Sequence, residues 1–158
     1  MSYRWFVIAL ALHVLAVVVW IGGIAAVTTV MFPAMRQLDS NDRKVWLFQQ
    51  IERRFRPQAA IAWLIVGLSG LYMVYSLDAW PRFASIHYWW MDAMAALWLL
   101  FGLMLFIIEP FVVGPYLERE LGSKPAKALA RAEGPHWILL ILSLLVIAAV
   151  VAGVHGWF

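Results

Sequence analysis

The sequence predicts an all-α integral membrane protein, a four-helix bundle in which each helix crosses the bilayer. Apolar residues make up 65% of the 158 residues and charged residues 13%, whereas soluble domains average roughly 45–50% apolar and 25% charged. The apolar residues are concentrated in long runs, each close to the ~20 residues that cross the hydrocarbon. Each run is expected to be helical, because lipid offers no hydrogen-bond partner to free backbone groups.

The whole chain, 1–158, is predicted to be a single transmembrane domain. Its predicted spans are about 5–32, 59–77, 87–113 and 136–158, with basic loops at 33–58 and 114–135. Pro33 is expected to end the first span, because proline lacks a backbone donor. Pro110 and Pro115 are expected to kink or end the third span. In the first loop apolar residues alternate with charges around Trp46 and Phe55, which predicts a short amphipathic helix on the membrane surface.

The distribution of Lys and Arg predicts the orientation of the bundle. Ten of these residues lie in the two basic loops, and only Arg4 and Arg82 lie elsewhere. By the positive-inside rule the basic loops face the cytoplasm and both termini face the periplasm, which predicts a multi-pass protein of a bacterial inner membrane. The positive charge thus follows membrane topology, and we expect no nucleic-acid partner. Small residues in the helices, such as Gly67 and Gly70, permit close packing and possible homo-oligomers.

The absence of cysteine restricts the cofactors that this chain can bind. Without thiolates it cannot hold an iron–sulfur cluster or a zinc knuckle. Any metal must therefore use His, Met or carboxylate ligands. No phosphate loop, dinucleotide fingerprint or nucleophile elbow is present, so hydrolase chemistry has no support.

Three of the four histidines are predicted to lie in the half of the bundle nearer the termini. They are His13 in the first span, His87 at the start of the third and His155 near the end of the fourth. An imidazole at membrane depth is functional by default, which favours His13 as a ligand. For His87 and His155 the sequence leaves two interpretations, a ligand or a boundary residue that faces water or headgroups. His136, at the opposite boundary, is expected to be an interface anchor.

Trp20 lies on the same face of the first span as His13, seven residues further on. A flat apolar wall beside an imidazole suits a porphyrin, whose iron accepts histidine as an axial ligand. The alternative interpretation of His13 is a hydrogen bond to a neighbouring helix and no further role.

Two carboxylates within the third span each need water, a cation or a proton. Asp92 is the candidate proton acceptor beside the histidines. Glu109 is expected to pair with an arginine of the basic loop, for instance Arg53 or Arg54. Met91 and Met94 follow His87, and together with His13 and His155 these side chains could bind copper(I), although methionine is also common packing material.

Several runs resemble the HemJ-type protoporphyrinogen oxidases and the related CopD-type membrane proteins. Ala11-Leu12-His13 followed by Trp20-Ile21-Gly22-Gly23 is similar to their first helix. Ile51-Glu52-Arg53-Arg54-Phe55, then Gly67-Leu68-Ser69-Gly70-Leu71, is similar to their second. Glu133-Gly134-Pro135 resembles the family's Asn-Glu-x-Pro. The chain departs from the family where Trp89 replaces the lysine of a His-x-Lys motif and where His155-Gly156 replaces Lys-Pro-Phe.

The resemblance implies a bundle that binds haem b, with His13 at the position of a functionally important histidine, and an oxidoreductase related to protoporphyrinogen IX oxidase. We therefore expect a redox protein with His13 as one axial ligand and His155 or His87 as the other. Its partners would be a porphyrin, a quinone or a redox protein. The CopD-type relatives imply copper binding as the alternative. A third hypothesis is a small assembly subunit without a cofactor.

Overall fold

The computed structural model describes residues 3–113, 115–116, 119–120 and 125–157. Four long helices are apolar enough to cross a membrane, and no strand occurs in these ranges. The predicted all-α four-helix membrane bundle is therefore confirmed. Lys124 of the second basic loop and position 158 of the fourth span lie outside the described residues.

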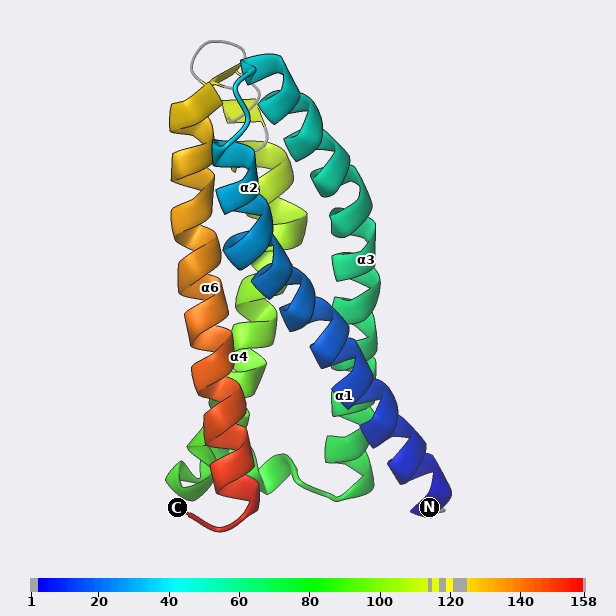
Figure 1. The fold of residues 1–158 in the computed structure, drawn as a ribbon. Coiled ribbons are helices and arrows are strands. Elements are labelled where there is room, and N and C mark those ends of the chain that lie inside the picture. The colour runs from blue at the N-terminus through cyan, green and yellow to red at the C-terminus, as the bar shows by residue number, and fades with distance from the viewer. Residues whose placement is uncertain (1–2, 114, 117–118, 121–124, 158) are drawn as a thin grey trace.

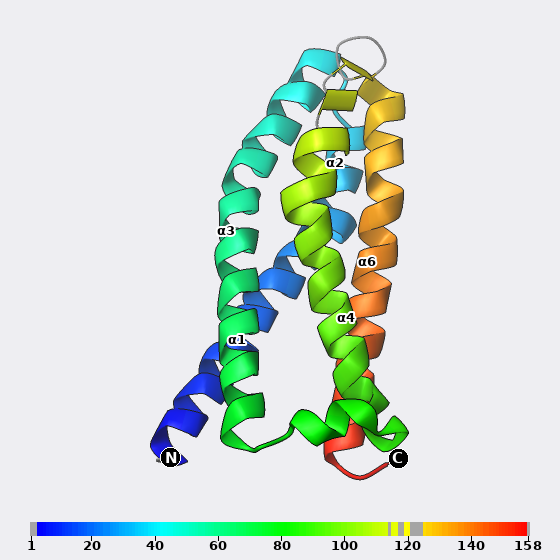
Figure 2. The ribbon, with the colours of Figure 1, turned by 180° about the vertical axis from the view of Figure 1, so that it is seen from behind.

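The elements follow the chain as α1 (Tyr3–Ala26), η1 (Val27–Met31), α2 (Phe32–Arg36), α3 (Asn41–Ser76), η2 (Trp80–Ala84), η3 (Ile86–Tyr88), α4 (Trp89–Leu103), η4 (Met104–Val113) and α6 (Pro125–Val154). In space α1 packs along α3, and α4 packs along α6 (Figures 1 and 2). Both termini lie at one end of the bundle, which we call the terminal end. The opposite end carries the loops rich in Lys and Arg, and we call it the basic end.

Proline widens the first helix without ending it. The turn η1, just before Pro33, is a π-helix, and α2 continues from it to Arg36. Proline cannot donate to the carbonyl one turn earlier, and a π turn is a common local adjustment to such a lost bond. The expectation that Pro33 ends the first span is therefore wrong. Pro110 likewise lies inside the π-helical η4, which runs on to Val113.

The first basic segment is folded differently from the surface helix that the sequence predicts. Residues from Asn41 onward belong to α3, which continues without a break through Pro57 into the second span. This helix has 36 residues, or about 54 Å of length, against ~30 Å of hydrocarbon. The bundle therefore extends well beyond the membrane at the basic end.

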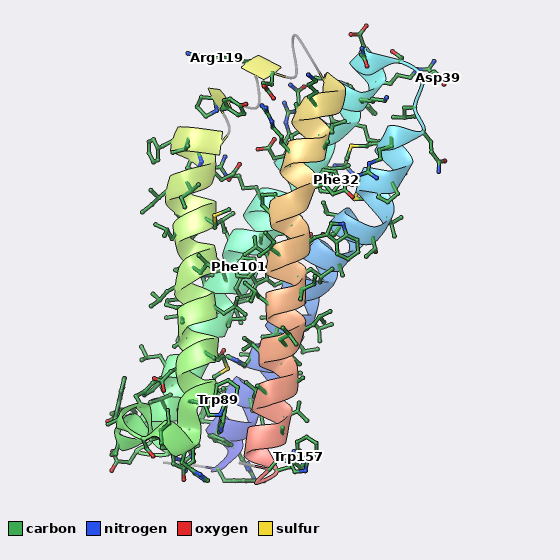
Figure 3. All side chains as sticks on the ribbon, turned by 90° about the vertical axis from the view of Figure 1, so that its left-hand side faces the viewer. Phe32, Asp39, Trp89, Phe101, Arg119 and Trp157 are labelled. Atoms are coloured by element: carbon green, nitrogen blue, oxygen red, sulfur yellow. The ribbon has the colours of Figure 1, made fainter. Side chains whose placement is uncertain are left out.

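A separate apolar cluster holds this extension together. It joins the end of the first helix to the starts of α3 and α6, and its buried members are Val27, Phe32, Met35, Ala128 and Leu129. Near it, Arg36 forms an ion pair with the buried Glu133. Figure 3 shows Phe32 near the basic end and Trp157 at the terminal end.

The central core lies where all four long helices meet. Trp20 of α1 packs edge-on against Phe101 of α4, with ring centroids 4.5 Å apart. Phe101 lies inside the bundle in Figure 3. Trp63 of α3 stacks on Trp98 of α4 at 4.4 Å, and each indole N–H donates to the backbone carbonyl of the other residue.

Two helices end at the terminal end with the same hydrogen-bonded cap. After α3, Asp78 adopts a φ of +47°, and the N–H of Ala79 donates to the carbonyl of Val74. After α6, Gly156 has a φ of +73°, and Trp157 N–H donates to Ala152. These are Schellman caps, which bind carbonyls that the helix itself leaves open. This cap ends α6 at Val154, so that His155 directly follows the helix.

Candidate functional site

The site is centred on His13, which lies between α1 and α3. Its Nδ1 is 3.1 Å from the carbonyl oxygen of Val66 and 3.1 Å from the hydroxyl oxygen of Ser69. The imidazole is half-buried, and Ser69 is buried. One polar side chain of the first span therefore meets the second span at two acceptors.

The partners of His13 fix which ring nitrogen carries the hydrogen. A backbone carbonyl can only accept, so Nδ1 must be the donor toward Val66. The one hydroxyl hydrogen of Ser69 lies within reach of the carbonyls of Ile65 and Val66 on its own helix, which leaves the lone pairs of the hydroxyl for His13. In the neutral ring Nε2 then carries a lone pair, and it has no hydrogen-bond partner among the described residues.

Gly70 makes room for the His13 ring. A Cβ atom at this position would lie 3.2 Å from Cε1 of His13, closer than most real contacts. Gly70 and Ser69 are adjacent, so α3 offers the imidazole both a small contact and a hydrogen-bond acceptor. The sequence predicts Gly70 as a close-packing residue, and the structure agrees.

The other histidines form no hydrogen bond to another helix among the described residues, although the ring of His136 packs edge-on against Phe32 of α2 at 5.2 Å. Nδ1 of His155 is 2.7 Å from the carbonyl of Val151, one turn back on α6, and the side chain is exposed. His136 makes the same contact with Ala132 at 2.8 Å. His87 is exposed, with its ring 4.9 Å from that of Tyr88. Among these four residues, His13 is the one whose hydrogen bonds cross to another helix.

The described residues contain no group of three or more His, Asp or Glu side chains that could hold a metal ion. His13, His87 and His155 are therefore not gathered into a shared metal site. Their common depth, from which convergence is predicted, does not bring them together. The reason is that His13 faces α3, while His155 bonds to its own helix and His87 precedes α4.

No hydrogen bond or ring contact joins the remaining predicted site residues to His13 within the described part of the chain. Trp20 is buried in the central core against α4. Asp92 is exposed in the first turn of α4, where a carboxylate favourably meets the positive end of the helix dipole. Met91 is buried with Ala79 and Trp90, and Met94 is half-buried.

Glu109 pairs with an arginine of the first basic loop, as the sequence predicts. Its Oε2 lies 3.1 Å from Nε of Arg56. Arg54 lines a groove toward α1 instead, because successive residues of a helix point in directions about 100° apart. The predicted pairing of Glu109 with an arginine of the basic loop is therefore confirmed, and the arginine is Arg56 and not one of the two examples, Arg53 and Arg54.

Ser69, which accepts the hydrogen bond of His13, is not among the site residues that the sequence predicts. A hydroxyl in an otherwise apolar span was the available signal, because such a group needs a partner at membrane depth. Which helix would supply that partner depended on the pairing of α1 with α3. Depth along the chain gave no information on that pairing.

Comparison with protein-family models, with curated proteins and with solved structures finds no match to this chain. The resemblance to the HemJ-type and CopD-type proteins therefore stays a prediction from the sequence runs that carry it.

Proposed function

We propose that this chain is a membrane redox protein that binds haem b, with His13 as an axial ligand. The observation that supports this function is the hydrogen bonding of His13, whose Nδ1–H is held by Val66 and Ser69. Histidine ligands of metals typically donate their second ring N–H to a carbonyl or carboxylate, which fixes the ring and its tautomer. The half-buried ring of His13 meets this requirement.

The fit is to a single well-oriented imidazole. His155 and His87 remain the predicted candidates for a second axial position, and neither has a contact to His13 among the described residues. When bound, the haem iron would supply one-electron transfer. The chain's own contribution would be to hold the ligand ring through Ser69 and Val66. Asp92 would accept a proton near the water boundary if a substrate is oxidised there.

We also propose an orientation of the chain in the membrane and a class of electron partner. Contact with lipid follows from the four spans. We place the basic end in the cytoplasm of a bacterium and both termini in the periplasm, because the basic loops hold ten of the twelve Lys and Arg residues. The electron partner would be a porphyrin, a quinone or a redox protein, which makes this a possible membrane oxidoreductase.

Absorption spectra of the purified protein test the haem. The wild type, expressed with a haem supply and purified in mild detergent, is expected to have a Soret band that sharpens and shifts on reduction with dithionite. His13→Ala should lose the band, because the substitution removes the imidazole that would bind the haem iron. A protein that takes up no haem, also after addition of hemin, would overturn the proposal.

His136→Ala is the matched control. His136 also donates through Nδ1 to a carbonyl, but within its own helix near the basic end. This variant should keep the haem, whereas equal loss in both variants would indicate general damage to the bundle. His155→Ala and His87→Ala then identify the second ligand through a change in spin state.

Copper is the alternative prediction for the same chain. It would use His13, His87, Met91, Met94 and His155. Metal analysis of the same preparation distinguishes the haem hypothesis from the copper hypothesis. A protein that contains iron but no copper would exclude the copper hypothesis. If the purified protein holds no metal and cells that carry His13→Ala behave like cells that carry the wild type, the cofactor-free assembly role is favoured.

A further inference from the structure

A groove of about 500 Å³ runs along the outer face of the contact between α1 and α3. This volume lies within the roughly 300–1,000 Å³ of typical ligand sites. Its walls include Leu15 and Val19 of α1 and Ile61 of α3, all exposed, and Ala16 and Ala62 form its buried floor. The small alanines allow the hollow, and the larger side chains on either side line it with apolar surface.

One end of the groove is polar. Arg54 and Gln58 line it on α3, about two turns and one turn before Ile61, where the apolar wall begins. The apolar run of α3 from Ala59 to Leu77 covers about 27 Å, which matches a hydrocarbon core of ~30 Å. Arg54 and Gln58 therefore lie where the headgroups of the basic-end leaflet begin.

Arg54 lacks a counterion within the described part of the chain. Arg36, Arg56 and Arg131 form ion pairs with glutamates. Arg54 and its neighbour Arg53 are exposed and form none with any described residue. A cation at the membrane boundary beside an apolar groove is best matched by an anion that also carries an apolar tail.

We propose that the groove between α1 and α3 binds an anionic phospholipid, with its phosphate on Arg54 and an acyl chain against Leu15, Val19 and Ile61. Guanidinium and phosphate form charge-assisted, often bidentate hydrogen bonds, and the Gln58 amide adds a further donor. The site does not depend on haem binding, because its residues are distinct from His13, Ser69 and Val66.

The charge of Arg54 favours an anionic lipid over two other occupants of the groove, a quinone and a second copy of this chain. A quinone would fill the apolar part but leave Arg54 without an anion. A second copy related by a two-fold axis along the membrane normal would bring the Arg54 side chains of both copies toward each other, and like charges repel. An anionic lipid satisfies both ends of the groove at once.

The test measures the thermal unfolding midpoint of delipidated protein in mild detergent with added phosphatidylglycerol or phosphatidylcholine. Phosphatidylglycerol should raise the midpoint by several degrees in a saturable way, because a ligand of the folded state stabilises it by mass action. Phosphatidylcholine and inorganic phosphate should raise it far less. Equal effects of the two lipids, or a larger effect of ubiquinone, would overturn the proposal.

Arg54→Gln should weaken the apparent affinity for phosphatidylglycerol about tenfold or more, as expected for a lost charge-assisted hydrogen bond. Arg43→Gln is the matched control, since Arg43 is an exposed cation of the same helix outside the groove. It should retain the affinity. A similar loss in both variants would indicate diffuse attraction to the basic surface and overturn the site.

A second measurement needs no variant and keeps the test decisive if Arg54→Gln fails to insert. Native mass spectrometry of the wild type, with equal amounts of both lipids, should detect one retained phosphatidylglycerol in several-fold excess over phosphatidylcholine. Equal retention of the two lipids, or a dimer without bound lipid, would overturn the proposal.

Discussion

The contact of α3 with α1 and its contact with α4 are built from opposite kinds of side chain. Toward α1, α3 offers Ser69 and Gly70 to the imidazole of His13. Toward α4 it offers Trp63, which stacks on Trp98 and exchanges two hydrogen bonds with it. One contact is close and partly polar, and the other is a wide aromatic pair.

The two contacts differ most in how completely their polar groups are bonded. Each indole has one donor, and both donors of the tryptophan pair reach a carbonyl. His13 has two ring nitrogens, and only Nδ1 is bonded to described residues. The tryptophan pair thus has no donor left over, whereas the imidazole of His13 keeps one ring nitrogen with a lone pair, which the proposed role as a ligand requires. This difference supports His13 as the functional residue.

Trp63→Ala is expected to have the largest effect on stability. It removes a stacked ring, takes the indole donor away from the Trp98 carbonyl and opens space beside Gly102, where a Cβ would lie 2.6 Å from the Trp63 ring. Because Trp63 is half-buried, the loss should be about 3 kcal/mol, at the lower end of the values for buried Trp→Ala changes. Chemical or thermal unfolding in detergent measures it. A loss below that of His13→Phe would mean that the aromatic pair does not hold α3 to α4.

Gly23→Ala is expected to have an intermediate effect, because it pushes α1 away from α3. A Cβ at Gly23 would lie 2.3 Å from the Phe55 ring. Since the ring must move, we expect a loss of about 1–3 kcal/mol, as for other overpacked sites. The neighbouring Gly22 has open space around the same position. Gly22→Ala should therefore leave the unfolding midpoint unchanged or raise it, and equal losses in both variants would contradict the packing of this interface.

His13→Phe is expected to have the smallest effect on stability and the largest on cofactor binding. Hydrogen bonds between membrane helices contribute about 0.6 kcal/mol on average, and phenylalanine preserves much of the ring volume. The unfolding of the haem-free protein should change by less than about 1 kcal/mol, while haem uptake is lost. A loss of several kcal/mol would assign His13 to packing and bring it level with the tryptophan pair.

Parts of the fold could be predicted because they depend on local composition. The four spans follow from apolar runs, and Asp92 in the first turn of α4 is consistent with the helix dipole. Pro57, by contrast, lies inside α3 although proline disfavours a helix interior. The ends of the spans were less predictable. Pro33 was expected to stop a helix that continues to Arg36, because a π turn beside Thr28 accommodates it.

The candidate site could be predicted only in part. The depth of His13 and the small size of Gly70 were available from the sequence. The assignment of Arg56 to Glu109 and the separation of His13 from His155 were not, because both depend on which face of a helix meets which neighbour. Helices of similar apolar composition pack in several ways that sequence periodicity does not distinguish.

By itself the sequence determined that this chain is helical and lies in a membrane, and that its positive charge gathers at one end. These properties follow from the transfer of side chains and backbone from water to lipid, which each segment undergoes independently. The tertiary structure decided that α1 meets α3 at Ser69, so that Nδ1 of His13 is hydrogen-bonded and Nε2 is not bonded to any described residue. It also decided that Arg54 lies at the end of an apolar groove. Such pairings depend on side-chain fit and hydrogen bonding between helices, because the surrounding lipid is as apolar as the helix surfaces and does not select among them.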